Sequence, residues 1–340
     1  MTDAADVFAT ATEAKQLNDR LFGKEEKEFG RVYRGRYHMP LLPGESGTKS
    51  GGDWVPYGVQ RVTNLVGAFE DTRALSVWEQ SMTLAGLALS PELYEELTLL
   101  VHRAASSGAN FELMRELTEL KEALAGDAHD SGKQEASIAG RAKLIARGSA
   151  GAQRGTNRHT AWEHRAETGE LIGTPDIRAQ IVETERLLAE AGLRRLPYLS
   201  ERIVRNTEVG AAGKFDDILF EVSTERLLIA DLKSKPTAFY SWMTVDAQLA
   251  TYANADWMLH ATKSGMSGGP AYYTHGPRQL GVDLTEGVIL HVPSDGGPAR
   301  LERADLVQGW ETAKLARQVI DHRSAGKSAG RHARSAWITR

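Results

Sequence analysis

The sequence predicts an α/β (α+β) protein, in which a core of helices and strands follows a mainly helical N-terminal region. Apolar residues recur at helical spacing over 61–124, which predicts the helical region. Three strand-like runs then follow one another closely over 202–232, with helical segments before and after them. This order of elements favours a mixed core in which helices pack on a sheet.

Composition narrows the classes of function. The chain has 340 residues, of which 41% are hydrophobic and 25% charged, as in soluble globular proteins. It contains no cysteine, which excludes disulfides, thiolate zinc sites and cysteine-ligated iron–sulfur clusters. A net charge of -4 excludes a polybasic wrapper of nucleic acid. No apolar run suggests a secretory signal or a membrane span, so we expect a cytoplasmic protein without membrane contact.

The first half of the chain predicts helices joined by turns. Residues 1–30 are highly charged and predict a helix, and the alternation over 31–38 predicts a short strand. Turn-forming residues over 41–52 predict a loop. In the helical region over 61–124, Ser90 and Pro91 are typical of a helix cap followed by a first-turn proline. Gly, Asp and Ser over 126–132 then predict a linker.

The second half of the chain contains the elements that we expect to form the core. Helices are expected over 156–169 and 175–192, followed by strands over 202–209, 214–222 and 226–232 in an antiparallel meander. A helix over 244–260 and a glycine-rich loop over 265–270 come next. An apolar strand over 288–292 and a closing helix over 306–321 complete the core, and a basic tail follows.

Polar residues at the ends of two predicted strands suggest a reaction centre. Asp216 begins the middle strand, and Asp231 and Lys233 lie at the far end of the next one, so antiparallel pairing brings the two acids to the same end of the hairpin. Asp231 and Lys233 project from one face, while Leu232 points into the core. Two carboxylates and an amine suit metal-assisted phosphoryl hydrolysis. Ordinary strand-end charges are the alternative explanation, because Asp-x-Lys alone is common.

Four motifs in order resemble those of one nuclease family. They are Gly155-Thr-Asn-Arg-His159, Gly213-Lys-Phe-Asp216, Asp231-Leu-Lys233 and Gln248-Leu-Ala-Thr-Tyr252. The series is similar to that of the PD-(D/E)XK nucleases of the RecB-like group, which includes phage exonucleases and CRISPR-associated exonucleases. The resemblance covers residues 136–320 and implies a restriction-endonuclease-like core with a central mixed sheet flanked by helices. Residues 1–130 would be the helical N-terminal region and 321–340 a basic C-terminal tail.

The resemblance also implies roles for individual residues. The catalytic set would be His159, Asp216, Asp231 and Lys233. The ligands of Mg²⁺ or Mn²⁺ would be His159, Asp216, Asp231 and the backbone carbonyl of Leu232. Gln248 and Tyr252, four residues apart and so on one helical face, would contact DNA near the scissile phosphate.

The function that the resemblance implies is a Mg²⁺-dependent DNA exonuclease for recombination, repair or end processing, as phages encode. DNA would be the partner, with a recombination or single-strand-annealing protein as a candidate second one. Many relatives carry four cysteines for an iron–sulfur cluster, which this chain lacks. No nucleotide-binding G-x-x-x-x-G-K-[ST] motif is present. The alternative functions are a noncatalytic DNA-binding protein that retains the nuclease fold and a structural protein of a phage particle.

Several other residues remain candidates for the site. Glu163, Glu201 and Glu208 are further acids, which rank below the motif residues. Trp162 could stack on bases, although core packing is the simpler explanation. Arginines around the core could line a groove for phosphates, namely Arg154, Arg158, Arg165, Arg194, Arg195, Arg202 and Arg205.

Overall fold

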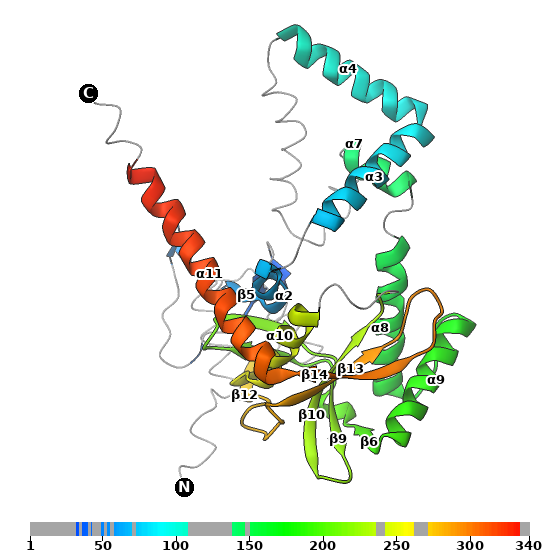
Figure 1. Ribbon diagram of the computed structural model, residues 1–340, viewed down its shortest axis with the longest axis vertical. Helices are drawn as coiled ribbons and strands as arrows, with labels where there is room; N and C mark the ends of the chain where they lie inside the picture. Colours follow the sequence, from blue (N-terminus) through cyan, green and yellow to red (C-terminus); the bar gives the residue numbers. More distant parts are fainter. Residues whose placement is uncertain are drawn as a thin grey trace. The chain divides into compact units, whose positions relative to one another are not determined.

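The computed structural model (Figure 1) describes residues 32–33, 36–39, 42, 49–50, 53–54, 58–69, 73–107, 138–146, 150–235, 242–261 and 271–333. The helix expected over 1–30, the linker over 126–132 and the glycine-rich loop over 265–270 lie outside these residues. Most of the loop expected over 41–52 and the last part of the basic tail do so as well.

The chain divides into two compact units, one of which contains residues 32–36 and 71–156. This unit, which we name unit 2, holds β1 (Val32–Tyr33), α3 (Arg73–Leu89), α4 (Pro91–Ser107) and α7 (Ile138–Ile145). Ser90 caps α4, because its hydroxyl accepts a hydrogen bond from the backbone N–H of Leu93 over 3.3 Å. The cap and the first-turn proline are therefore confirmed, although the helical stretch expected over 61–124 has Arg61 in a strand and is interrupted at Ser90. Its part over 108–124 lies outside the described residues.

Unit 1 contains residues 37–70 and 157–340 and most of the strands. One of its sheets runs in the order β2-β5-β8-β7-β11-β12. The pair β5 and β8 is parallel, whereas β7 pairs antiparallel with both β8 and β11. The strands are β2 (Arg36–His38), β5 (Gly58–Arg61), β7 (Ile203–Asn206), β8 (Ala211–Lys214), β11 (Trp257–Ala261) and β12 (Ala271–His275). A short pair, β3 (Lys49–Ser50) and β4 (Asp53–Trp54), stands apart.

The second sheet runs in the order β14-β13-β10-β9-β6. The central pair β10 and β13 is parallel, and the other pairs are antiparallel. Its strands are β6 (Leu193–Arg195), β9 (Asp217–Glu221), β10 (Arg226–Lys233), β13 (Glu286–His291) and β14 (Arg300–Asp305). The α+β class is therefore confirmed, with two mixed sheets in place of the single one expected.

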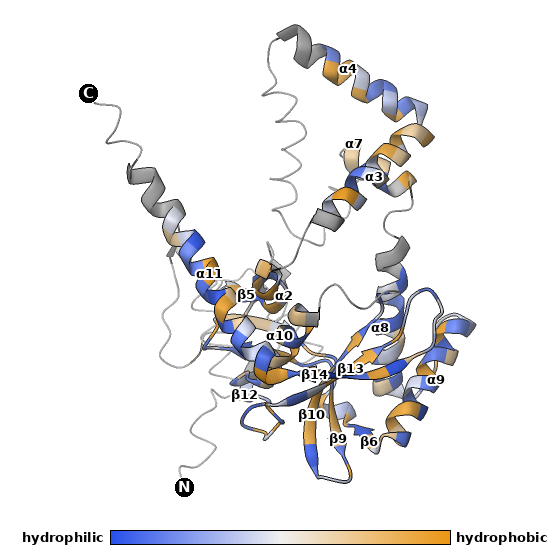
Figure 2. Ribbon diagram, in the orientation of Figure 1, coloured by the Kyte–Doolittle hydropathy of each residue, from blue (hydrophilic) through white to orange (hydrophobic). Residues whose placement is uncertain are grey.

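Helices cover both faces of the second sheet. Leu228, Ala230 and Leu232 of β10 pack with residues of α8 (Ala150–Thr168) and α9 (Pro175–Glu190). Ile229 faces the opposite side, toward α10 (Trp242–Ala253) and α11 (Leu306–Ala333). Figure 2 shows hydrophobic and hydrophilic residues along α9, as one-sided burial requires. Shorter helical turns are α2 (Val62–Val66), η2 (Gly67–Phe69) and η3 (Pro197–Leu199).

Two expectations for the core are wrong. The three strands expected as one meander lie in different sheets: the first corresponds to β7, which pairs with the unexpected β8, and the other two form the β9–β10 hairpin. The chain leaves the first sheet between Lys214 and Asp217. The helix expected over 244–260 ends at Ala253, and Trp257 already lies in β11. The apolar run from Trp257 suits a helix and a buried strand equally.

The strands that were not expected are β3, β4, β5, β6, β8, β12 and β14. Helix α11 continues past the predicted end at 321 to Ala333. Among the residues that the structure describes, none of the helices has the length and apolar character needed to cross a bilayer.

Candidate active site

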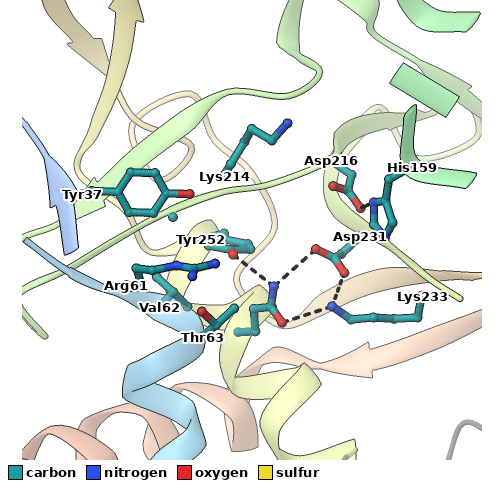
Figure 3. Close-up of a pocket in the computed structure, with 12 residues that line it drawn as sticks. Tyr37, Arg61, Val62, Thr63, His159, Lys214, Asp216, Asp231, Lys233 and Tyr252 are labelled. Atoms are coloured by element: carbon teal, nitrogen blue, oxygen red, sulfur yellow. Dashed lines mark hydrogen bonds and ion pairs between the residues drawn. The ribbon is translucent and has the colours of Figure 1, made fainter. Parts of the chain in front are cut away.

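The β9–β10 hairpin brings two aspartates to one end of the second sheet. Asp217 of β9 lies opposite Ala230 of β10, so Asp216 and Asp231 come together at the next register position. Both residues are buried, at 5% and 2% exposure, and both line the same pocket (Figure 3). The backbone N–H of Leu232 donates a hydrogen bond to Oδ2 of Asp216 over 2.6 Å. The predicted convergence of the two carboxylates is therefore confirmed.

Lys233 lies beside Asp231 on the same face of β10. Its ammonium forms an ion pair with Oδ2 of Asp231 and donates a hydrogen bond to Oε1 of Gln248 over 3.1 Å. The intervening Leu232 is fully buried on the opposite face. A contribution of Leu232 to the site would therefore have to come from its backbone, in keeping with the alternation expected for a strand.

Gln248 and Tyr252 lie one turn apart on α10, as predicted, and they make different contacts. The Gln248 amide donates to the Tyr252 hydroxyl over 3.0 Å, and its nitrogen lies 3.5 Å from Oδ1 of Asp231. The Tyr252 ring belongs to the hydrophobic core, with 2% exposure, and packs near Phe215. Gln248 thus links Lys233, Asp231 and Tyr252, while Tyr252 holds Gln248 in place from the core side.

His159 reaches Asp216 from α8. Its Nδ1 lies 3.4 Å from Oδ2 of Asp216, and its side chain retains 38% exposure. Burial of the ring opposes its positive charge. The hydrogen bond and the charge of Asp216 outweigh burial and raise the pKa of His159. The Asp216 carboxylate thus favours the protonated form of the imidazole.

The two carboxylates differ in their electrostatics. Burial opposes ionisation of Asp216, but its contacts with His159, the Leu232 N–H and Lys233 prevail and lower its pKa. For Asp231, burial and the nearby charge of Asp216 outweigh the attraction of Lys233 and raise its pKa. Paired acids whose pKa values are displaced in opposite directions are typical of functional sites.

A buried hydrogen-bond network holds α8 against β9 next to this site. Asp217, which is fully buried, accepts hydrogen bonds from Trp162 Nε1 over 2.5 Å and from Arg195 Nη2 over 2.9 Å. The Arg195 guanidinium also lies 3.8 Å from the centre of the Trp162 ring. Trp162 and Arg195 are therefore committed to the core, which confirms the simpler explanation for Trp162. This network fixes the helix that carries His159 relative to the strand that follows Asp216.

The donor set fits a hard divalent cation in its chemistry. Two buried carboxylates supply the oxygen ligands that Mg²⁺ prefers, and Mg²⁺ commonly takes only one or two protein carboxylates and completes its shell with water and phosphate. Among the described residues, no three His, Asp or Glu side chains are gathered closely enough to form a metal centre by themselves. His159 and Asp216 are in contact, and Asp231 lies at the same pocket.

The pocket also contains residues that the motif analysis did not assign. Its volume is about 220 Å³, and its lining includes Tyr37, Arg61, Thr63, Gly213 and Lys214. Lys214 lies inside the Gly213-to-Asp216 motif, so the sequence contained a signal for it. Arg61 comes to the site only through the parallel pairing of β5 with β8, in which Arg61 lies opposite Ala212. No local pattern indicates a pairing between segments so distant in sequence.

Of the additional acids, Glu201 lies nearest to the site. It forms an ion pair with Lys214, and burial together with the charge of Asp216 raises its pKa to about 8. Its backbone has a positive φ of 56°, which is uncommon outside glycine. Glu163 lies 3.9 Å from Lys214, whereas Glu208 approaches Arg278 at 3.9 Å and does not line the pocket.

Neither a protein-family model nor a curated protein sequence matches the chain.

Proposed function

We propose that this chain is a metal-dependent deoxyribonuclease with a PD-(D/E)XK-like core, acting as an exonuclease in DNA recombination, repair or end processing. The observation that carries the proposal is the convergence of two buried carboxylates, Asp216 and Asp231, with Lys233 at one end of the β9–β10 hairpin. A second support is that His159 and Gln248, which the motif series assigns to the same centre, contact these residues.

In this proposal Asp216 and Asp231 would hold Mg²⁺ or Mn²⁺, and the motif series implies His159 and the backbone carbonyl of Leu232 as further ligands. When bound, the cation supplies Lewis acidity and lowers the pKa of a coordinated water. The chain contributes two negative charges in a buried setting, where electrostatic attraction is stronger than in water. The imidazole of His159 and the ammonium of Lys233 lie next to these charges. His159 must release its proton before it can act as a ligand.

Lys233 acts on the reacting phosphate. The ammonium forms an ion pair with Asp231 and donates a hydrogen bond to the Gln248 carbonyl, so the group is held in a fixed direction. Held in this way, it donates hydrogen bonds to the attacking water or to a non-bridging phosphate oxygen. The negative charge that builds up on the phosphate in the transition state is thereby stabilised at little cost in reorganisation.

The proposed substrate is DNA, and the proposed setting is the cytoplasm, with a recombination or single-strand-annealing protein as a second partner. Binding of the polyanion rests on local cations, because the chain as a whole is acidic. Several arginines near the core are already committed to internal contacts: Arg158 to Gln180 and Asp176, and Arg165 to Glu185. These two are therefore poor candidates for phosphate contacts.

The experiment that tests this function uses DNA labelled separately at each end, with a circular duplex as control, in the presence of Mg²⁺ or Mn²⁺. We expect the wild-type protein to release nucleotides from linear ends and to leave the circle intact. Asp231→Asn should reduce the rate at least roughly a hundredfold, since it removes charge from the transition-state environment. Asp295→Asn, at an exposed loop position, is the matched control and should retain activity.

Two outcomes would contradict the proposal. DNA binding without cleavage by the wild-type protein would favour the noncatalytic alternative. Cleavage by Asp231→Asn at the wild-type rate would place the reaction outside this pocket.

A further inference from the structure

The pocket has a second half that the proposed reaction does not use. Beside the carboxylates, its lining contains two cationic side chains, Arg61 and Lys214, and the hydroxyls of Tyr37 and Thr63. Figure 3 shows the Tyr37 hydroxyl and the Arg61 guanidinium on the side of the pocket away from Asp216 and His159. One cavity therefore combines an acidic half with a half that is rich in hydrogen-bond donors.

Strands of the first sheet position the two cationic donors. Arg61 is the last residue of β5 and lies opposite Ala212 of β8, and Lys214 ends the same β8 strand. The Tyr37 hydroxyl lies close enough to both cations for their charges to lower its pKa, but burial outweighs them and the net effect is to raise the pKa of Tyr37. Tyr37 therefore keeps its proton at neutral pH and can donate a hydrogen bond.

The two cations differ in what neutralises them. Lys214 has an ion pair with Glu201 and a second acid, Glu163, at 3.9 Å. Arg61 is half-buried, and within the part of the chain that the structure describes its guanidinium has no hydrogen bond or ion pair. A cation partly removed from water is costly unless an anion or acceptor satisfies it. The planar fork of arginine matches the paired oxygens of a phosphate.

We infer that Arg61, assisted by Tyr37 and Thr63, forms a phosphate subsite next to the centre at which the phosphodiester is cleaved. This inference rests on the proposed nuclease function and specifies how that site would hold its substrate. The subsite takes a phosphate other than the one that reacts, because Arg61 lies apart from the acids that would hold the metal. That phosphate is either a terminal monoester or an internal diester of the same strand.

Equilibrium binding in EDTA tests the subsite without any turnover. A fluorescent oligonucleotide is titrated with the full-length protein at several salt concentrations, comparing wild type, Arg61→Ala, Arg61→Lys and Arg303→Ala. Arg303 is the matched control, since its side chain is 87% exposed and lies on β14, outside the pocket. We expect Arg61→Ala to weaken binding roughly tenfold and to reduce the salt slope by about one, as the loss of one phosphate contact predicts.

In the same titration, Arg61→Lys should recover part of the affinity and the full salt slope, and Arg303→Ala should match the wild type. Unchanged affinity and slope in Arg61→Ala would overturn the inference. Weaker binding with an unchanged slope would also overturn it, because Arg61 would then act on the fold and not on a phosphate. An absence of DNA binding by the wild type would overturn both the subsite and the proposed function.

Two modified substrates then identify the source of the phosphate. One carries a 5′-hydroxyl in place of a 5′-phosphate, and the other carries a neutral methylphosphonate beside the cleaved linkage. For the wild type in Mg²⁺, we expect one of the two modified substrates to have a kcat/KM at least roughly tenfold lower than unmodified DNA. For Arg61→Ala, we expect the same modified substrate and unmodified DNA to have equal kcat/KM values. If Arg61→Ala loses the sensitivity to the 5′-hydroxyl, the subsite binds a terminal monoester. If it loses the sensitivity to the methylphosphonate, the subsite binds an internal diester.

If both penalties persist in Arg61→Ala, the subsite is wrong although the nuclease proposal stands. The wild type could bind DNA with the expected difference in salt slope from Arg61→Ala and yet cleave nothing. The nuclease proposal would then be wrong, and the binding data would still support the phosphate subsite.

Discussion

Lys233 is held from two sides, by the Asp231 carboxylate and by the Gln248 carbonyl, and these contacts define what its removal should do. Lys233→Ala takes away the ammonium but leaves Asp216, Asp231 and His159 in place. We expect metal affinity to persist, and hydrolysis to fall at least roughly a hundredfold, as for the loss of an acid–base or electrostatic contributor. Calorimetric titration with Mn²⁺ and single-turnover cleavage measure the two effects separately.

Lys235→Ala is the matched control, because Lys235 is exposed and two residues further along the chain. If Lys233→Ala loses Mn²⁺ binding instead, the lysine helps to hold the metal and does not act on the water or the phosphate.

Gln248 and Tyr252 form one hydrogen-bonded unit, so their substitutions should act through Lys233. Gln248→Ala removes the acceptor that orients the ammonium, and Tyr252→Phe removes the hydroxyl that holds the Gln248 amide. We expect the double variant to keep its fold and metal affinity and to lose roughly a hundredfold in rate, since a misplacement of about 1 Å can cost this much. Single-turnover cleavage measures the loss. A double variant that cleaves at the wild-type rate would show that the pair is only part of the core.

At the scale of single elements, Gly213 of β8 leaves space for the Tyr252 ring of α10. A Cβ added at Gly213 would lie 2.5 Å from Cε1 and 2.9 Å from the hydroxyl oxygen of Tyr252. Tyr252 is buried and cannot move aside freely. Gly213→Ala should therefore destabilise the fold by about 1–3 kcal/mol, as overpacking does, and should reduce cleavage at least roughly tenfold by displacing Gln248.

Thermal unfolding and initial cleavage rates measure these two effects. Gly326→Ala is the control, because a Cβ there meets nothing within 4 Å and alanine is the better helix former. Equal behaviour of the two variants would refute the close packing of β8 on α10.

The pKa of Asp246 on α10 leads us to expect that the free energy of unfolding depends on pH. This effect does not involve the residues of the pocket. Burial and the charge of Asp305 raise its pKa to about 6. Because the folded state holds this proton more tightly than the unfolded chain, the favourable contribution is complete below about pH 4 and is lost as the pH rises through 6.

Asp246→Asn removes that loss, because the amide is uncharged at either pH. We expect the variant to be more stable than the wild type at pH 8, by on the order of 1 kcal/mol, and to gain little at pH 4. Urea unfolding at the two pH values measures the difference. A gain of the same size at both pH values would contradict the assignment of the effect to ionisation.

The sequence predicts some contacts between these elements and not others, depending on whether the contact arises within one hairpin or between distant segments. The Asp216–Asp231 pair depends on one hairpin with a short turn, so local spacing predicts it. The division of the meander between two sheets depends on the direction of the chain at Phe215, which strand propensity does not encode. Arg61 reaches the pocket through the pairing of β5 with the distant β8, which no local pattern indicates. Helix α10 ends at Ala253, and the Asn254 side chain donates a hydrogen bond to the Ala250 carbonyl of its last turn.

At the scale of the whole molecule, all residues of the candidate site belong to unit 1, including those supplied by the segment 37–70 ahead of α3. None of the described residues that line this pocket belongs to the helices of unit 2. The side chains proposed for catalysis and for substrate positioning therefore all belong to unit 1, and so does every variant proposed for them.

The central claim is that the buried carboxylate pair makes DNA cleavage depend on a divalent cation. The most direct measurement is the initial rate of cleavage of a labelled duplex by the full-length protein, in Mg²⁺ or Mn²⁺, then in excess EDTA, and again after Mg²⁺ is restored. We expect cleavage with either cation, complete loss in EDTA and full recovery on restoration, with Asp216→Asn inactive throughout. Undiminished cleavage in excess EDTA, or equal cleavage by Asp216→Asn, would contradict it.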